Sequence, residues 1–376
     1  MMHTPSRALI AMSGGVDSSV AALRMQQMGC ECVGVTMKLY DNEQIGLDKG
    51  HTCCSLDDVE DARQVCYTMG IPHYVIGLKD CFSEKVIDRF VRSYERGETP
   101  NPCIDCNRFL KFDSLYSRME ILDCQIFVTG HYARVEYDPV RERWLLKKAR
   151  NKAKDQSYVL YFMTQELLAH ACFPLGEYED KEEIRRIAAG SGFVNARKHD
   201  SQDICFVPDG DYAAFIERRT GKKWPEGDFT DQQGHVLGRH KGQIRYTIGQ
   251  RRGLGLSLPA PLYVCGKDPE KNTVILSPEE KLFSRELVAE DFNWIAYEAP
   301  AGPVHVCARP RYRAKEAPAT AEVLEDGRVR VVFDEPQRAI TPGQAVVLYD
   351  GDLVVGGGTI CPDNSVKKGN CEGACD

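Results

Sequence analysis

Long hydrophobic runs are missing from this sequence. None of its 376 residues lies in an apolar stretch long enough to cross a bilayer. The first residues, MMHTPSRALIAMSGG, contain only a short apolar run and lack the small-residue cleavage site of a signal peptide. We therefore expect a cytoplasmic protein, not associated with a membrane, whose thiols are kept reduced. Internal repeats and low-complexity segments are also missing, so neither a solenoid nor a disordered chain is expected.

An overall positive charge is missing too, because the formal net charge is −7 at pH 7. This excludes a protein that is basic all over its surface, but nucleic-acid binding requires only a local basic face. Basic residues gather in three segments, at residues 141–154, 238–253 and 308–315. One such run alone would be an ordinary solvated surface. Three of them in a net-acidic chain predict a segregated basic face.

Strand-like apolar runs alternate with helical patterns in the first half of the chain. Strands are expected at residues 7–12, 30–40, 72–78 and 125–135, with helical patterns between them. This alternation predicts an α/β fold with a parallel sheet and helices on both faces. Sheets of this kind bind nucleotides at the carboxyl ends of their strands.

The chain is too long for one core, and its texture changes near residue 210. Short, glycine-broken hairpins are expected there. Further along, period-two alternation with Asp-Gly turns at Asp326 and Asp350 predicts a small antiparallel β-barrel. The expected domains are residues 1–209 for nucleotide binding and catalysis, 210–280 as a small central domain, 281–362 as the barrel and 363–376 as a flexible tail with cysteines.

The string SGGVDSS, residues 13–19, lies between the first expected strand and an amphipathic helix. Its glycines let the backbone approach a phosphate, and its serines add hydroxyl donors at the positive end of the helix. The Lys-Ser/Thr ending of loops that grip a γ-phosphate for hydrolysis is absent. We therefore expect a phosphate-binding loop of another kind.

Cys103 and Cys106 are separated by two residues in the string TPNPCIDCN, in a chain with sixteen cysteines. In a reducing compartment this spacing is typical of a catalytic or metal-binding pair before a structural disulfide. Eight other cysteines lie in apolar surroundings, where a buried structural role is expected: Cys30, Cys32, Cys66, Cys81, Cys124, Cys172, Cys265 and Cys307.

Five strings occur in order along the chain: TPNPCIDCN, TGHYAR, KDQSYVLY, KHDSQDICF and YTIGQRRGLGL. SGGVDSS resembles the PP-loop of ATP pyrophosphatases, which cleave ATP between the α and β phosphates to adenylate an oxygen. With the five strings, nearly the whole chain resembles the bacterial tRNA-specific 2-thiouridylases. The resemblance implies a Rossmann-like PP-loop domain, a central tRNA-binding domain and a C-terminal barrel. It also implies that sulfur replaces the C2 oxygen of the wobble uridine in tRNA.

The implied chemistry agrees with the residues. A uracil carbonyl oxygen is a poor leaving group, adenylation converts it into AMP, and thiolates or persulfides are strong nucleophiles. By resemblance, Cys106 is the nucleophile and Cys205 carries a persulfide, loaded by an external sulfur donor or relay protein. A disulfide between two cysteines can release the sulfur.

The resemblance also implies the binding residues for ATP and tRNA. The ATP residues, with magnesium near Asp17, are Ala11, Met12, Ser13, Gly14, Gly15, Val16, Asp17, Ser18, Ser19, Met37 and Gly130. The tRNA residues are Asn101, Pro102, Cys103, His131, Lys154, Asp155, Gln156, Arg311, Tyr312 and Gln344, among which Arg311 and Tyr312 suit an RNA stacking platform.

The chain departs from the family pattern at Cys103, a position where many members have an aspartate. Cys103, Cys106 and Cys205 could therefore hold an iron-sulfur cluster with an open iron, or zinc with one more ligand. Alternatively, Cys103 is a resolving thiol. Metal-like spacing also occurs at His51, Cys53 and Cys54 and at Cys371 and Cys375, where structural or incidental roles are expected.

Two rival functions use the same motifs differently. A PP-loop ligase would adenylate a small molecule, which leaves the basic runs and the cysteine pair without a role. A nucleic-acid-binding module with structural zinc on the two cysteines would bind RNA without ATP turnover, which leaves SGGVDSS unexplained.

Overall fold

A parallel β-sheet forms the centre of the first domain. The computed structural model describes residues 6–40, 56–198 and 204–362. The strands of this sheet run parallel in the order β3-β2-β1-β4-β7, which confirms the predicted α/β fold. They are β1 (Arg7–Ala11), β2 (Glu31–Lys38), β3 (His73–Gly77), β4 (Ile126–Val128) and β7 (Ala171–Cys172).

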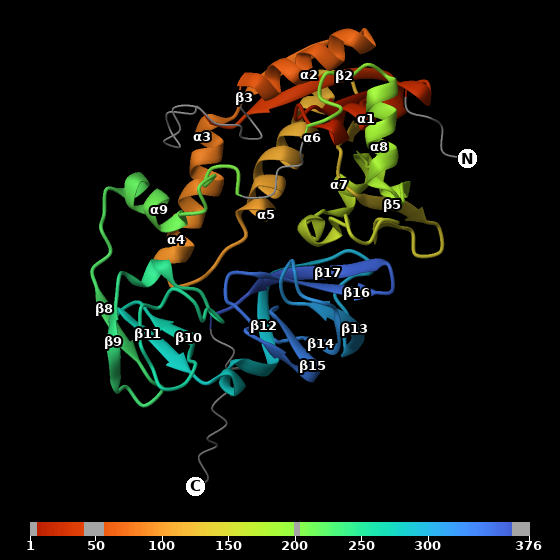
Figure 1. Ribbon diagram of the computed structural model, residues 1–376. Helices are drawn as coiled ribbons and strands as arrows, with labels where there is room; N and C mark the ends of the chain where they lie inside the picture. Colours follow the sequence, from red (N-terminus) through yellow and green to blue (C-terminus); the bar gives the residue numbers. More distant parts are fainter. Residues whose placement is uncertain (1–5, 41–55, 199–203, 363–376) are drawn as a thin grey trace.

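Helices cover both faces of this sheet. Successive residues of β1 point to opposite faces and are apolar, so both faces are buried under helices. Leu9 packs in one hydrophobic cluster with residues of α3, α4 and α6, and Ile10 packs in a second with residues of α1, α2 and α8 (Figure 1). The helical segments are α1 (Val16–Gln27), α2 (Leu56–Met69), α3 (Lys79–Phe82), η2 (Ser83–Ile87), α4 (Asp88–Glu95), α5 (Pro102–Cys106), η3 (Asn107–Phe112), α6 (Asp113–Ile121), η4 (Ser157–Leu160), α7 (Gln165–His170), η5 (Pro174–Glu177) and α8 (Lys181–Gly190).

The prediction of a single strand at residues 125–135 is wrong, because two separate strands lie there. β4 ends at Val128, and the chain turns before β5 (Ala133–Asp138), which pairs with β6 (Arg143–Lys148) in a hairpin. This hairpin joins the sheet of the C-terminal barrel through Lys147 and Leu353. The break allows Gly130 to approach α1 closely, which a continuous strand would prevent.

The central domain is a small mixed sheet beside one helix. Two hairpins, β8–β9 and β10–β11, are antiparallel, and the parallel pair β11–β8 joins them in the order β10-β11-β8-β9. The prediction of hairpins is therefore confirmed. The elements are α9 (Tyr212–Thr220), β8 (Gly227–Thr230), β9 (Val236–His240), η6 (Gln243–Arg245), β10 (Tyr263–Asp268), β11 (Thr273–Ser277) and η7 (Glu279–Leu282).

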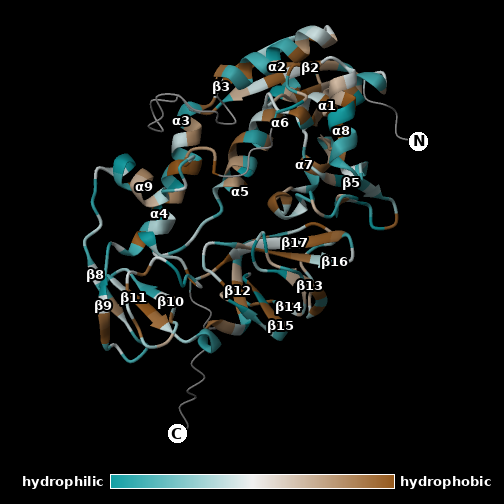
Figure 2. Cartoon of the chain, viewed as in Figure 1, coloured by the Kyte–Doolittle hydropathy of each residue, from teal (hydrophilic) through white to brown (hydrophobic). Residues whose placement is uncertain are grey.

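The C-terminal strands form a closed antiparallel barrel, as predicted. β12 pairs with both β15 and β17, so the sheet closes on itself. The barrel interior is apolar, and β16 and β17 are largely hydrophobic (Figure 2). The strands are β12 (Phe283–Trp294), β13 (Val304–Arg309), β14 (Ala317–Val323), β15 (Val329–Arg338), β16 (Ala345–Asp350) and β17 (Leu353–Ile360).

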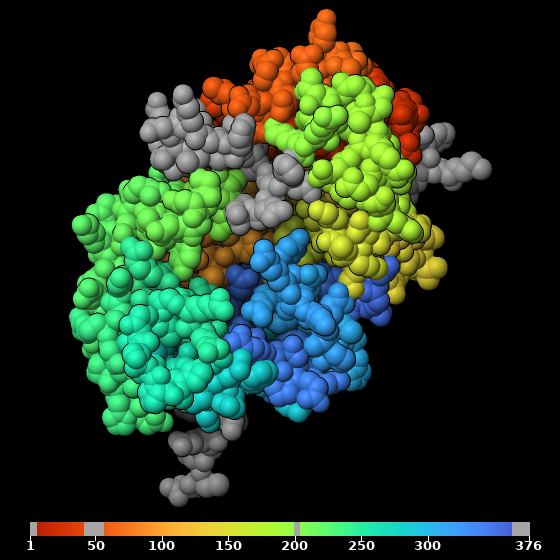
Figure 3. Space-filling view, in the orientation of Figure 1, coloured from red at the N-terminus to blue at the C-terminus, as the bar shows by residue number. Residues whose placement is uncertain are grey.

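The three domains meet around the segment between α4 and α5. The Thr99 N–H donates to the carbonyl of Pro342 at 2.9 Å, which docks a barrel loop there. A Cβ added at Gly97 would lie 3.2 Å from Pro269 of the central domain. In Figure 3, atoms of the first domain are recessed between the central domain and the barrel. Within the described residues, no helix is long and apolar enough to cross a membrane.

Candidate functional site

The phosphate loop follows β1 and opens α1, where the carboxyl end of a strand meets a helix N-terminus. Gly14 has a φ of +73°, and a Cβ there would lie 2.3 Å from the backbone oxygen of Asp58. Only glycine therefore fits. The hydroxyls of Ser18 and Ser19 each donate to the Gly15 carbonyl at 3.0 Å. In this conformation, these two hydroxyls hold the loop in shape.

Asp17 is held by two residues that sequence analysis did not identify. Nζ of Lys181 lies 2.6 and 2.7 Å from the two carboxylate oxygens, and the Tyr132 hydroxyl donates to Oδ1 at 2.7 Å. Lys181 begins α8, and its side chain is 10% exposed. A buried cation is thus placed at the first turn of α1, where an anionic ligand would bind. No sequence motif marked it, because Lys181 lies far along the chain from the loop.

No sequence motif marked Asn195 either, because it also lies far along the chain from the phosphate loop. Its Nδ2 donates to the Gly14 carbonyl at 3.0 Å and to the Ser19 Oγ at 2.9 Å. Its Oδ1 is buried and has no hydrogen-bond partner among the described residues. This side chain holds one carbonyl and one hydroxyl of the loop, and its own amide oxygen accepts no hydrogen bond from the described residues.

The other residues expected at ATP lie around this loop. A Cβ at Gly130 would lie 2.8 Å from the Ser18 nitrogen, so the end of β4 packs directly against α1. Met37 lies near the carboxyl end of β2 and is 9% exposed. Ala11 ends β1, while Met12 and Val16 are buried on either side of the turn. The loop, Met37 and Gly130 therefore share one edge of the parallel sheet.

The two cysteines of TPNPCIDCN lie on a short helix. Asn101 caps α5 by accepting a 3.2 Å hydrogen bond from the Cys103 N–H, and Pro102 occupies the first turn. Cys103 is exposed. Cys106 is 8% exposed and packs in the hydrophobic cluster of the first domain. The helix therefore turns Cys106 inward and leaves Cys103 at the surface.

Cys205 lies beside the end of β2. The Tyr40 hydroxyl donates to the Cys205 carbonyl at 3.3 Å. The next residue, Phe206, is buried against Phe82 and Phe90 at ring-centroid distances of 5.7 and 5.3 Å. Cys205 packs against the same hydrophobic cluster that contains Cys106. Residues almost a hundred positions apart in the chain therefore border one core beside the nucleotide edge of the sheet.

Metal binding by these thiols finds no support in their arrangement. Among residues 6–40, 56–198 and 204–362, no three His, Cys, Asp or Glu side chains converge to hold an ion. This part of the chain includes Cys103, Cys106 and Cys205. His51, Cys53, Cys54, Cys371 and Cys375 lie outside the described residues.

Asp155 and Gln156, two of the residues expected at tRNA, accept hydrogen bonds from other residues of the protein. Gln156 accepts from the Tyr132 N–H at 2.9 Å, which ties KDQSY to TGHYAR. Asp155 is 8% exposed, and its carboxylate accepts bonds from the Ala149 N–H and from the N–H and hydroxyl of Ser157. Burial raises the pKa of Asp155. Its carboxylate therefore shapes this loop.

His131 and Gln344 are also engaged within the protein. Thr129 Oγ1 and His131 Nδ1 lie 2.7 Å apart, and burial lowers the pKa of His131 to about 3, with a smaller effect from Lys111. Its imidazole is therefore neutral at physiological pH. Gln344 donates from Nε2 to the Thr99 carbonyl at 2.6 Å. This bond links the barrel to the segment that leads into α5.

Tyr312 packs against a residue of another motif. Burial raises the pKa of Tyr312, and the positive charge of Arg309 opposes this effect. Tyr312 is 39% exposed, and Arg311 beside it is half-buried. The Tyr312 ring packs edge-on against Tyr158 at a ring-centroid distance of 5.6 Å, so the barrel residue Tyr312 meets the KDQSYVLY motif of the first domain.

Comparison with known proteins now decides the family. Three family models match: "tRNA methyl transferase HUP domain" at residues 6–209, "tRNA methyl transferase PRC-barrel domain" at 213–278 and "Aminomethyltransferase beta-barrel domain" at 284–360. The tRNA-specific 2-thiouridylase MnmA of Clostridioides difficile is 48% identical over 360 residues, which cover 96% of this chain and 99% of that protein. The MnmA of Moorella thermoacetica is 52% identical over 353 residues, covering 94% and 98%. This chain belongs to the tRNA-specific 2-thiouridylase family.

Membership of the thiouridylase family confirms the resemblance identified from the motifs. A third relative, the MnmA of Acetivibrio thermocellus, is 49% identical over 356 residues, covering 94% of this chain and 99% of that protein. The similarity therefore extends through the central domain and the barrel, and not only through the phosphate loop.

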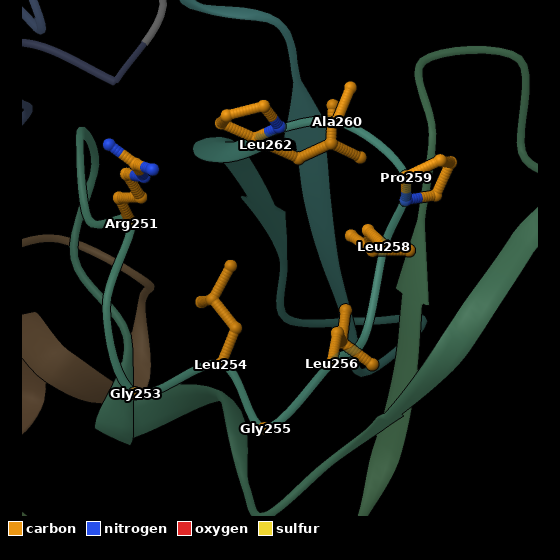
Figure 4. A pocket seen from close by; sticks show the side chains of 10 residues that line it. Arg251, Gly253, Leu254, Gly255, Leu256, Leu258, Pro259, Ala260 and Leu262 are labelled. Atoms are coloured by element: carbon orange, nitrogen blue, oxygen red, sulfur yellow. The ribbon is translucent and has the colours of Figure 1, made fainter.

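The linings of two cavities of this thiouridylase do not include the site cysteines. One, of about 160 Å³, lies between α4, α5 and the barrel, and its lining includes Asn101, Asp105 and Arg108. The other, of about 310 Å³, lies within the loop from Arg251 to Leu262 in the central domain (Figure 4). Its walls are mainly leucines, two glycines and two prolines, with Arg251 at one side. Neither lining includes Cys103, Cys106 or Cys205.

Proposed function

We propose that this protein is a tRNA 2-thiouridylase, which uses ATP to replace the C2 oxygen of the wobble uridine with sulfur. The observation that supports this function is the full-length similarity to 2-thiouridylases at about half identity. The geometry agrees, because a phosphate loop and two cysteine-bearing segments border one edge of the parallel sheet. A small-molecule ligase or a zinc-bound module would leave one of these features unused.

The first step is adenylation. The uridine O2 attacks the α-phosphorus of ATP, its bond to that phosphorus forms, and pyrophosphate leaves. The residues proposed to bind ATP are those of the loop, Met37 and Gly130, with backbone N–H groups and the positive end of α1 facing the phosphates. Lys181 adds a buried positive charge at the same place and would stabilise the charge that develops on the leaving pyrophosphate.

The second step transfers sulfur. The terminal sulfur of a persulfide on Cys205 attacks C2, and AMP leaves with the former C2 oxygen. The thiolate of Cys106 then attacks the sulfur of Cys205, which breaks the sulfur–sulfur bond, releases 2-thiouridine and leaves a Cys106–Cys205 disulfide. A thiol reductant returns the two cysteines to the reduced state. A persulfide-donating protein loads Cys205 for the next cycle.

The arrangement of residues does not fit a resident metal, and we derive no step through one. Both carboxylate oxygens of Asp17 accept from Lys181, so a magnesium ion here would compete with that cation. The described residues offer no three-ligand group for iron or zinc. Sulfur therefore travels on cysteine in this proposal, and Cys103 serves to contact the base.

The tRNA is proposed to bind across the meeting point of the three domains. Asn101, Pro102 and Cys103 meet the wobble base, which is flipped out of its stack. His131, Lys154, Gln156, Arg311 and Tyr312 surround it, while Asp155 and Gln344 hold the surrounding segments. Basic side chains there bind phosphates without sequence preference. A cytoplasmic location agrees with this substrate.

The test incubates the protein with ATP, a persulfide donor and unmodified tRNA. AMP, pyrophosphate and a sulfur-for-oxygen mass shift at uridine are expected together. Cys106→Ser should abolish the shift and keep AMP formation. Cys265→Ser, in the central domain, is the matched control and should behave as the wild type. AMP formation without any shift in the wild-type protein, under reducing conditions, would contradict the proposed function.

A further inference from the structure

We propose that Arg309 is a positioning residue that holds the Tyr312 ring as the stacking surface for the wobble base beside Cys103. The inference builds on the proposed function, because it specifies how the reacting base is held. Arg309 ends β13, three residues before Tyr312.

The Arg309 side chain contacts both the ring and the backbone around Tyr312. Its guanidinium carbon lies 5.6 Å from the centroid of the Tyr312 ring and 5.5 Å from that of Tyr158. The two rings are 5.6 Å apart at an angle of 65°. A guanidinium nitrogen also donates to the Tyr312 carbonyl. One side chain therefore contacts the Tyr312 backbone, the Tyr312 ring and the Tyr158 ring that meets it edge-on.

Tyr158, the inner ring of this edge-to-face pair, is held in place by burial and a hydrogen bond. Tyr158 is fully buried, and its hydroxyl donates to the Ala345 carbonyl of β16 at 2.7 Å. Tyr158 belongs to the KDQSYVLY motif, which is bonded through Gln156 to Tyr132. Tyr312 is the outer member and is 39% exposed. Of the two rings, the Tyr312 ring is therefore the one on which an RNA base could stack.

Stabilisation of the fold explains Arg309 only in part. Burial raises the pKa of Asp155 and the charge of Arg309 opposes this effect, but Arg309 forms no ion pair with a carboxylate of the described residues. Its Nε is buried without a hydrogen-bond partner among these residues. Burial of an unpaired N–H costs free energy, and an apolar residue of similar length would avoid that cost. A planar cation that stacks on aromatic rings is instead suited to fixing their orientation.

The Tyr312 ring and Arg309 lie beside the helix that carries Cys103 and Cys106. The helix α5 contacts η4, the short helix that contains Tyr158, so the ring on which Tyr312 packs lies beside the helix that carries these cysteines. Cys103 and Cys106 both lie in α5, three residues apart. A base stacked on Tyr312 would therefore be held next to the segment that carries the nucleophile.

A double-mutant cycle tests whether Arg309 acts through Tyr312. The variants are Arg309→Met, Tyr312→Ala and the two combined, with Arg285→Met on the exposed barrel surface as the matched control. Thiolation kcat and KM, the tRNA Kd and the Tm are measured for each. Arg309→Met should lower kcat/KM roughly tenfold, in line with the loss of one stacking interaction. The tRNA Kd should change less than about twofold, since phosphate contacts dominate it.

The decisive comparison is the effect of Arg309→Met in the Tyr312→Ala background. If Arg309 acts by holding Tyr312, the second substitution adds no further loss. An undiminished loss in that background, or a Kd that weakens as much as kcat/KM, overturns the inference. Should Arg309→Met lower the Tm, Arg309→Lys replaces it in the same cycle. If the wild-type protein does not thiolate tRNA, the proposed function is contradicted. If the wild type is active but the losses from the two substitutions add in the double variant, only this inference is contradicted.

Discussion

Lys181 donates to both carboxylate oxygens of Asp17, at 2.6 and 2.7 Å, and so joins the start of α8 to the first turn of α1. The pair connects residues 164 positions apart in the chain. Its lysine is nearly buried, whereas its carboxylate is partly open. A cation is thus fixed at the nucleotide edge of the sheet before any ligand arrives.

Lys181→Met should reduce tRNA-dependent AMP formation by about a hundredfold, the usual effect of removing one charge-stabilising donor. It should also lower the free energy of unfolding by about 1–3 kcal/mol, because Asp17 loses its charged partner. Radiolabelled ATP turnover and urea unfolding measure the two effects. Lys222→Met, at an exposed pair with Glu95, is the control and should change neither. Full AMP formation by Lys181→Met would show that this cation does not act on the phosphates.

Gly14→Ala should abolish ATP use. The residue has a positive φ, and the new methyl group would meet the Asp58 backbone at 2.3 Å, so the loop must move. Gly29→Ala is the matched control, because Gly29 has a φ of +88° and nothing within 4 Å of an added Cβ. That variant should lose only about 1–2 kcal/mol from the backbone conformation and keep its activity. Equal activity in both variants would mean that close packing of the loop is unimportant for ATP use.

Cys103→Asp should retain thiolation within a few-fold of the wild type. Only Cys106 and Cys205 are proposed to carry sulfur, and Cys103 is exposed at the N-terminal turn of α5. An aspartate there is favoured by the helix dipole. The sulfur-for-oxygen mass shift in tRNA is the measurement, with Cys106→Asp as the inactive comparison. Complete loss of the shift in Cys103→Asp would instead assign sulfur or metal chemistry to this thiol.

The stability of the protein should fall as the pH decreases below about 6.5. The pKa of His131 is lowered from 6.5 to about 3, chiefly by burial. The unfolded chain therefore binds a proton that the folded protein excludes between these values, and the stabilising effect of a neutral His131 is complete above pH 6.5. Between pH 7 and 4, the free energy of unfolding measured in urea should fall less steeply with decreasing pH for His131→Gln than for the wild type. An unchanged slope would indicate that His131 is readily protonated in the folded protein.

Local patterns of the sequence were sufficient for the phosphate loop and the class of fold. SGGVDSS identified a loop between a strand and a helix because glycine spacing, serine hydroxyls and hydrophobic periodicity are all short-range properties. The barrel followed from period-two alternation and the turn residues Asp326 and Asp350 in the same way. The order of the motifs was enough to indicate the family.

Tertiary structure alone decided which distant residues complete the site. Lys181 and Asn195 reach the loop from beyond the parallel sheet, and no local pattern marks them. The inward orientation of Cys106 depends on which side of α5 packs on the core, and the break between β4 and β5 leaves Gly130 packed closely against α1. Sequence determines the propensities of short segments, whereas contacts between distant segments depend on how their hydrophobic faces are buried together.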